Sequence, residues 1–299
     1  MFVQGNYRID FIGIGAAKSG TTWLAHILKN HPQVFISPLR KEINYFNKYL
    51  AQDYQTVNYE YRHPYEWYHS FFKDVGNGQI AGDITPSYLS MENAALDIFN
   101  YNPAIKLFSI LRNPIERSFS EYLFSKQNGV NNYKTFEEAL EKNPKKFVQS
   151  SMYARNLERF YDKFQRNQIK ILFFDDIQEN AKELLNEVYE FLNIDPFYPD
   201  NYESIINKGK VARSHSINNI IGQSKLLIHR NGLQFFLPFL KKLGVLNLMN
   251  TIKNKNLTAR KEKLSPDPTT KQKLMDKFVN DIERLEELTG RDLSSWKII

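Results

Sequence analysis

The 299-residue chain contains no cysteine. This absence excludes disulfides, iron–sulfur ligation, thiolate metal sites and thiol catalysis, and it fits a reducing compartment. The amino terminus has no basic stretch followed by an apolar signal core, so we expect a cytoplasmic protein. Long hydrophobic runs are also missing. Residues 233–249 come nearest, but Pro238, Lys241 and Lys242 interrupt them, so no membrane span is expected.

Basic residues, in contrast, are in surplus: 40 lysines and arginines against 33 acidic side chains give a net charge of +7. This balance favours anionic partners, which include nucleotides, sulfated or phosphorylated acceptors and nucleic acid. Composition does not choose among them, because many basic proteins bind nothing through their surplus charge.

Five short β-rich segments alternate with amphipathic stretches along the chain. They are residues 8–15, 32–37, 78–85, 104–112 and 167–176. The alternation predicts an α/β fold with a central, mainly parallel sheet and helices on both faces. Pro86 and Pro114 are expected just inside the helices that follow the third and fourth strands. Ligands of such a sheet bind at the carboxyl ends of its strands, whereas the strand order is not readable from the sequence.

The pattern changes after residue 195. We predict a single domain in which residues 1–195 form a nucleotide-binding α/β core and residues 196–299 form basic loops and a helical carboxyl-terminal cap. In the last segment apolar residues recur at helical spacing and Gly290 is a natural helix end. These residues are Leu274, Phe278, Ile282, Leu285 and Leu288.

The most informative segment is residues 11–28, FIGIGAAKSGTTWLAHIL, which reads as strand, glycine-rich turn and helix. Its glycines have the separation of the phosphate-binding loop G-x-x-x-x-G-K-[ST], but Thr21 stands in the lysine position and Lys18 precedes the second glycine. The backbone N–H groups of Gly20, Thr21 and Thr22 at a helix start still suit a phosphate.

The metal half of an ATP site has no clear counterpart. The fourth strand ends in LRNP at 111–114, where an ATPase would place an aspartate for magnesium. Asp83, Asp175 and Asp176 follow other strands, but each serves equally well as a helix cap. The loop therefore predicts a nucleotide that is held without a metal.

Two longer motifs resemble a known family. KSGTTWL at 18–24 and LRNPIERSFSEYLF at 111–124 resemble the two donor-binding signatures of the sulfotransferases that use 3′-phosphoadenosine 5′-phosphosulfate (PAPS). Further motifs resemble the heparan sulfate branch and the bacterial members of that family. They are KEINYFN at 41–47, GDITPSYL at 82–89, SMYARNLERFYDKF at 151–164 and LEELTGRDLSSW at 285–296.

The resemblance implies a P-loop-like fold and an enzyme that moves a sulfuryl group from PAPS to an acceptor hydroxyl and releases adenosine 3′,5′-bisphosphate. It implies PAPS as donor substrate, no metal and no nucleic acid partner; the acceptor, a carbohydrate, a lipid or another small metabolite, stays open, as does the oligomeric state. Sulfuryl transfer moves less negative charge than phosphoryl transfer, so positioning and a cation at the leaving oxygen suffice without a metal.

Residue roles follow from the resemblance. Residues 18–22, namely Lys18, Ser19, Gly20, Thr21 and Thr22, would bind the 5′-phosphosulfate, with Lys18 as the catalytic cation, and Trp23 would stack on adenine or else be a buried core residue. Arg112 ends the fourth strand and Ser120 lies about two helical turns later, so both side chains can reach one phosphate. By resemblance that group is the 3′-phosphate; the alternative for Arg112 is a pair with Glu116 or Glu121.

Glu42 is the expected general base, because the heparan sulfate branch uses the glutamate of its matching K-E motif. The alternative is a surface glutamate in the first turn of a helix. Ile84 departs from the pattern, because this position is often basic in the glycosaminoglycan enzymes. Arg260 and Lys261 are expected in a lid over the donor; the basic loop at 208–213 is an alternative, and either is also explained as a solvated charge run.

Two other functions compete with a sulfotransferase. One is a P-loop kinase for a small molecule, which would need ATP and magnesium. The other is a non-catalytic binder of the nucleotide or of a sulfated glycan, in which Glu42 would have no role.

Overall fold

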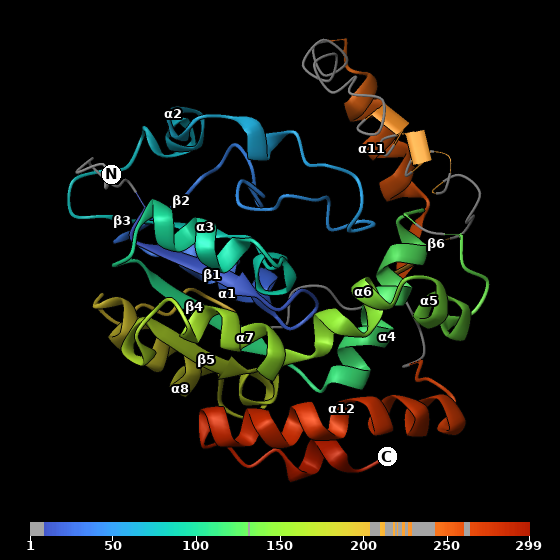
Figure 1. The fold of residues 1–299 in the computed structure, drawn as a ribbon. Coiled ribbons are helices and arrows are strands. Elements are labelled where there is room, and N and C mark those ends of the chain that lie inside the picture. The colour runs from blue at the N-terminus through green and yellow to red at the C-terminus, as the bar shows by residue number, and fades with distance from the viewer. Residues whose placement is uncertain are drawn as a thin grey trace.

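The computed structural model describes residues 9–130, 132–203, 210–212, 218, 220, 223–224, 227–228, 243–259 and 264–299. Its centre is a parallel sheet of five strands in the order β2-β3-β1-β4-β5 (Figure 1). The strands are β1 (Phe11–Gly15), β2 (Val34–Ile36), β3 (Ile80–Ile84), β4 (Lys106–Leu111) and β5 (Ile169–Phe173). Each lies inside a segment that the sequence predicted, so the predicted α/β fold with a parallel sheet is confirmed.

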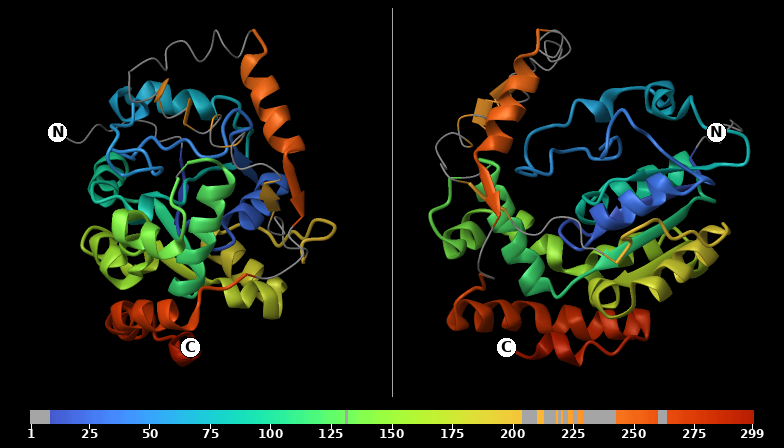
Figure 2. Two further views of the ribbon diagram at one scale, coloured as in Figure 1. Left: turned by 90° about the vertical axis from the view of Figure 1, so that its right-hand side faces the viewer. Right: turned by 180° about the vertical axis from the view of Figure 1, so that it is seen from behind.

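Apolar side chains alternate along the strands and so supply both faces of the sheet. In β4, Leu107 and Leu111 pack into one hydrophobic cluster, and Phe108 and Ile110 pack into the other. The first cluster is covered by α3 (Ala94–Tyr101), α7 (Tyr153–Tyr161) and α12 (Pro268–Thr289). The second is covered by α1 (Thr21–Asn30) and α8 (Phe174–Leu192), which lie in front of the sheet in the view from behind (Figure 2).

Of the two prolines that were predicted to start helices, only Pro114 does so. Pro114 is the first residue of α4 (Pro114–Gln127), as predicted, and the Asn113 side chain caps the helix by accepting the N–H groups of Ile115 and Glu116. The prediction for Pro86 is wrong, because α3 begins only at Ala94. Pro86 instead lies in a turn closed by a 3.1 Å hydrogen bond from the N–H of Tyr88 to the carbonyl of Thr85. Its fixed φ suits the second position of a turn as well as a helix start.

The carboxyl-terminal helix forms the predicted cap. α12 packs against α7 and α4, and Leu274, Phe278, Ile282 and Leu285 are buried. It ends at Gly290, whose φ of 70° is left-handed. This part of the sequence prediction is confirmed.

The described part of the chain contains four further α-helices and a second, two-stranded sheet. They are α2 (Tyr65–His69), α5 (Phe136–Lys142), α6 (Pro144–Phe147), α11 (Val245–Lys255), and the two-stranded antiparallel ribbon of β6 (Lys210–Ala212) and β7 (Leu257–Ala259). α11 extends away from the sheet at the edge of the molecule (Figure 1). A membrane span needs a long apolar helix, and no helix in the described part of the chain meets that requirement.

Candidate active site

The glycine-rich turn joins β1 to α1 and gives the site its floor. Lys18 and Gly20 both have left-handed backbones, with φ of 71° and 94°. The left-handed backbone at Gly20 favours glycine, and a Cβ there would lie 2.7 Å from Cδ1 of Ile177 in α8, so that side chain would also have to shift. The turn ends at Gly20, which is the residue before α1, so the free N–H groups of the helix start face the end of the sheet where β1 terminates.

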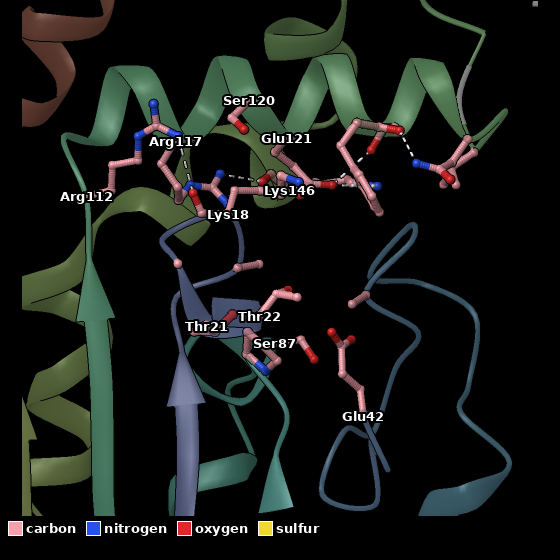
Figure 3. Close-up of a pocket in the computed structure, with 18 of the residues that line it drawn as sticks. Lys18, Thr21, Thr22, Glu42, Ser87, Arg112, Arg117, Ser120, Glu121 and Lys146 are labelled. Atoms are coloured by element: carbon pink, nitrogen blue, oxygen red, sulfur yellow. Dashed lines mark hydrogen bonds and ion pairs between the residues drawn. The ribbon is translucent and has the colours of Figure 1, made fainter. Parts of the chain in front are cut away.

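A cavity of about 640 Å³ opens above this turn. The predicted site residues that line it are Lys18, Gly20, Thr21, Thr22, Trp23, Glu42, Arg112 and Ser120. Figure 3 shows the side chains of α4 along one wall, with Glu42 pointing into the space from the opposite side. The tertiary structure thus brings together residues as far apart in the sequence as Lys18 and Ser120.

In the described part of the chain, Ser19 is the predicted site residue that is not part of that lining. Ser19 is fully buried in the turn, and its N–H bonds to the carbonyl of Ala16. Arg260 and Lys261, predicted for the lid, lie outside the described residues, as do Lys208 and Arg213 of the alternative basic loop. The choice between these two loops remains a prediction.

Lys18 lies beneath α4. Its Nζ is 4.0 Å from the centre of the Phe124 ring, in cation–π geometry. Burial lowers the pKa of the Lys18 ammonium, and the positive charges of Lys41 and Arg112 act in the same direction, whereas Glu121 and Glu42 oppose them. An ammonium in such surroundings gains from a bound anion, because the anion compensates both the burial and the neighbouring cations.

Arg112 follows β4 directly and reaches over the turn. Its Nη2 and Nε donate to Oε2 of Glu116 at 2.6 and 3.1 Å, and its Nη1 lies 3.5 Å from the carbonyl oxygen of Lys18. The guanidinium also stacks on Phe174, 4.8 Å from the ring centre. The sequence left open whether Arg112 pairs with Glu116 or reaches a bound phosphate. In the structure Arg112 pairs with Glu116 and also lines the cavity.

Trp23 is a buried core residue and also lines the cavity. Its side chain is only 2% exposed and belongs to the hydrophobic cluster between α1 and α8, although it also reaches the cavity wall. Its indole Nε1 donates to the carbonyl of Tyr202 at 2.6 Å. The role of its ring toward adenine stays a prediction.

Glu42 lies in the loop that follows β2, outside any helix, so the alternative of a helix-terminal glutamate is wrong. Its carbonyl accepts hydrogen bonds from Arg40 Nε at 3.1 Å and Asn44 Nδ2 at 2.9 Å, which fix the backbone of the loop. Its carboxylate is 41% exposed at the cavity, 3.6 Å from the Nζ of Lys41. Among the described histidines, which are residues 26, 31, 63 and 69, none lines the cavity.

A group of charged residues that were not predicted as site residues lies on the α4 side of the cavity. Glu121 accepts from Ser125 at 2.9 Å and pairs with Lys146 Nζ at 3.4 Å, and Arg117 donates to the Lys146 carbonyl at 3.1 Å. Burial alone would raise the pKa of the Glu121 carboxyl, but the charges of Lys146, Arg117 and Lys18 together hold it below its ordinary value. Glu121 follows the predicted Ser120, which was a usable signal, whereas nothing in the sequence marked Lys146.

The three aspartates considered for magnesium have other partners. Asp83, at the end of β3, is buried and accepts hydroxyl hydrogen bonds from Thr85, Tyr68 and Tyr88 at 2.8 to 3.0 Å. Burial raises the pKa of the Asp83 carboxyl to about 6, against the effect of these hydrogen bonds. Asp175 accepts from the Trp296 indole and Asp176 pairs with Arg291. In the described part of the chain, no three or more histidine or carboxylate side chains are grouped closely enough to hold a metal ion.

A family model described as "Sulfotransferase domain" matches residues 8–212. The chain belongs to this sulfotransferase family. Its predicted class, a sulfotransferase with PAPS as donor, is thereby confirmed, and the acceptor is left open.

Individual relatives agree with the assignment. The chain is 39% identical over 121 residues to the membrane-associated sulfotransferase kil1 of Dictyostelium discoideum. These residues make up 40% of the chain and 23% of kil1. It is 28% identical over 253 residues to heparan sulfate glucosamine 3-O-sulfotransferase 5 of Mus musculus, covering 77% of the chain and 69% of the relative. A sulfotransferase structure from Alicyclobacillus acidocaldarius shares the fold, with a TM-score of 0.68, 20% identity and coverage of 98% and 100% of the two chains.

Proposed function

We propose that this sulfotransferase moves the sulfuryl group of PAPS to an acceptor hydroxyl with protein cations in place of a metal ion. One observation carries the proposal. The phosphate-binding turn with Lys18 and the arginine that ends β4 face Glu42 across a single cavity (Figure 3). Anion-binding groups and a carboxylate that can accept a proton are thus available to the same bound molecule.

The turn and Lys18 act on the donor. The N–H groups at the start of α1 and the hydroxyls of Thr21 and Thr22 bind the 5′-phosphosulfate. Lys18 stabilises the negative charge that develops on the oxygen between phosphorus and sulfur as the sulfur–oxygen bond breaks. Its partly buried position strengthens that interaction, because burial removes part of the hydration of the ammonium.

Glu42 acts on the acceptor. It takes the proton of the attacking hydroxyl while the new oxygen–sulfur bond forms, and adenosine 3′,5′-bisphosphate leaves on the opposite side of the sulfur. Its fixed backbone and its exposed carboxylate suit this task, since the carboxylate is held near the donor turn and still reachable by a second substrate.

Arg112 and Ser120 select the nucleotide. Both line the cavity from β4 and α4, and we assign them to the 3′-phosphate that ATP and ADP lack. Trp23 is assigned to the adenine, and Arg260 and Lys261 to the closing loop. The chain then works as a single domain, 1–299.

The acceptor that we propose is a carbohydrate hydroxyl. The relationship to a heparan sulfate glucosamine 3-O-sulfotransferase favours a carbohydrate hydroxyl over a lipid. Heparan sulfate itself is disfavoured as acceptor, because the position that is often basic in the glycosaminoglycan enzymes is the apolar Ile84, which is 2% exposed and belongs to the core. We propose a cytoplasmic location, supported by a sequence free of cysteine.

The test compares nucleotides by thermal shift and then by turnover. Adenosine 3′,5′-bisphosphate should raise the melting temperature without added metal, since a ligand of the folded state stabilises by mass action. ATP with magnesium should protect much less. Equal protection by both would support the kinase alternative. Protection without any transfer of labelled sulfate across a panel of hydroxylated acceptors would support a non-catalytic binder.

A further inference from the structure

Lys41 connects the two halves of the site. Its Nζ donates a 2.8 Å hydrogen bond to the hydroxyl of Thr22 in the first turn of α1, and it lies 3.6 Å from Oε1 of Glu42. Lys41 also lines the cavity. In Figure 3, Thr22 and Glu42 face one another across the open part of the cavity, so an ammonium in contact with both stands between the donor turn and the candidate base.

The loop around Lys41 is held in place by its neighbours. The Arg40 guanidinium turns away to Glu60 at 2.8 Å, while its Nε binds the carbonyl of Glu42. Asn44, with a left-handed φ of 60°, donates through its side chain to the same carbonyl, and its own N–H reaches Thr85 on the β3 side at 3.4 Å. The charge that this loop presents to the cavity is therefore that of Lys41 rather than that of Arg40.

The geometry of sulfuryl transfer determines which substrate atoms come close to the Lys41 ammonium. In an in-line displacement the acceptor hydroxyl and its base approach the sulfur from the side opposite the leaving oxygen. The donor turn with Lys18 holds the leaving side and Glu42 serves the attacking side, so the nonbridging sulfuryl oxygens pass between them. An ammonium has three N–H donors, and the bond to Thr22 uses one. The exposed pair with Glu42 is weak and readily exchanged for a substrate oxygen.

We propose that Lys41 is a catalytic residue that binds a nonbridging oxygen of the sulfuryl group during transfer. This assignment rests on the proposed function. In the step, the acceptor oxygen–sulfur bond forms, the sulfur–oxygen bond to the 5′-phosphate breaks, the hydroxyl proton moves to Glu42, and the developing charge on the leaving oxygen is met by Lys18. Lys41 keeps its proton throughout and lowers the barrier by electrostatic stabilisation.

The proposal makes a distinction between two nucleotides that differ only in the sulfuryl group. Lys41→Met should weaken PAPS binding about tenfold, the order expected for one charge-assisted contact, and should leave the affinity for adenosine 3′,5′-bisphosphate within twofold of the parent. Calorimetric titration of both nucleotides measures this without an acceptor. Lys41→Arg keeps the charge and should recover most of the loss. Lys48→Met, on the exposed part of the same loop, removes an equal charge and should change neither affinity.

Turnover supplies the second readout. Conversion of PAPS to adenosine 3′,5′-bisphosphate, with an acceptor or with water as the slow acceptor, should fall about 10- to 100-fold at saturating donor in Lys41→Met. Equal losses for the two nucleotides, or unchanged turnover, would show that Lys41 only supports the turn and would overturn the assignment while the enzyme stays a sulfotransferase. A parent protein that binds neither nucleotide would overturn both this assignment and the proposed function.

Discussion

Replacing Arg112 by alanine tests the donor site most directly. In the structure two N–H groups of Arg112 bind Glu116, and the same guanidinium stacks on Phe174 beside the turn. When the 3′-phosphate binds, these donors turn to it or are shared with it. The substitution therefore removes a bidentate, charge-assisted interaction with the phosphate.

The expected loss of binding free energy in Arg112→Ala is the contribution of the contact with the phosphate less that of the pair with Glu116. Hydrogen bonds to a charged group contribute about 1.5 to 3 kcal/mol each, so a bidentate contact is worth at least about 3 kcal/mol. The pair with Glu116 must be given up or weakened on binding, but its partners are 19% and 46% exposed, and such pairs contribute about 0 to 1 kcal/mol. The expected net loss is at least about 2 to 3 kcal/mol, equal to a rise in Kd of at least about 30- to 150-fold.

The assay is calorimetric titration with adenosine 3′,5′-bisphosphate and with adenosine 5′-phosphosulfate, which lacks the 3′-phosphate. Arg112→Ala should weaken the first strongly and the second less than about threefold. Glu116→Gln should tighten the first by up to about fivefold, because it removes the competing carboxylate. Arg155→Ala, an exposed arginine on α7, serves as the matched control. Equal losses for both nucleotides in Arg112→Ala, or weaker binding in Glu116→Gln, would refute the assignment.

Three further predictions concern the chemistry and the core beneath it. Glu42→Gln should lower turnover about a hundredfold or more with unchanged stabilisation by adenosine 3′,5′-bisphosphate, and near-parental turnover would remove its role as base. Lys18→Ala should reduce kcat more than donor affinity at saturating PAPS, whereas a pure anchor would lose affinity with kcat kept. Because burial raises the pKa of Asp83 from 3.8 to about 6, its contribution to stability is full below about pH 4 and is lost, by up to about 3 kcal/mol, as the pH rises through 6. Urea unfolding of Asp83→Asn should lack this decline between pH 4.5 and 7, and parallel pH profiles for the two proteins would contradict it.

The sequence by itself determined the local elements. The spacing of apolar residues encodes the strands and the final helix. The ends of helices are encoded by residues with restricted or permissive backbones, such as Pro114 at the start of α4 and Gly290 at the end of α12. The glycine-rich turn between β1 and α1 was predictable for the same reason, because Gly20 suits its left-handed position. Pro86 was predicted wrongly, since a proline suits a turn and a helix start equally.

Only the tertiary structure decided what these elements bring together. The order β2-β3-β1-β4-β5 depends on pairings between segments far apart in the chain, which no local pattern reveals. That order places the ends of β1 and β4 side by side and so sets Arg112 over the turn that carries Lys18. The contact of Lys41 with Thr22 and the burial of Glu121 with Lys146 arise in the same way, because a side chain's partners are fixed by packing rather than by spacing in the sequence.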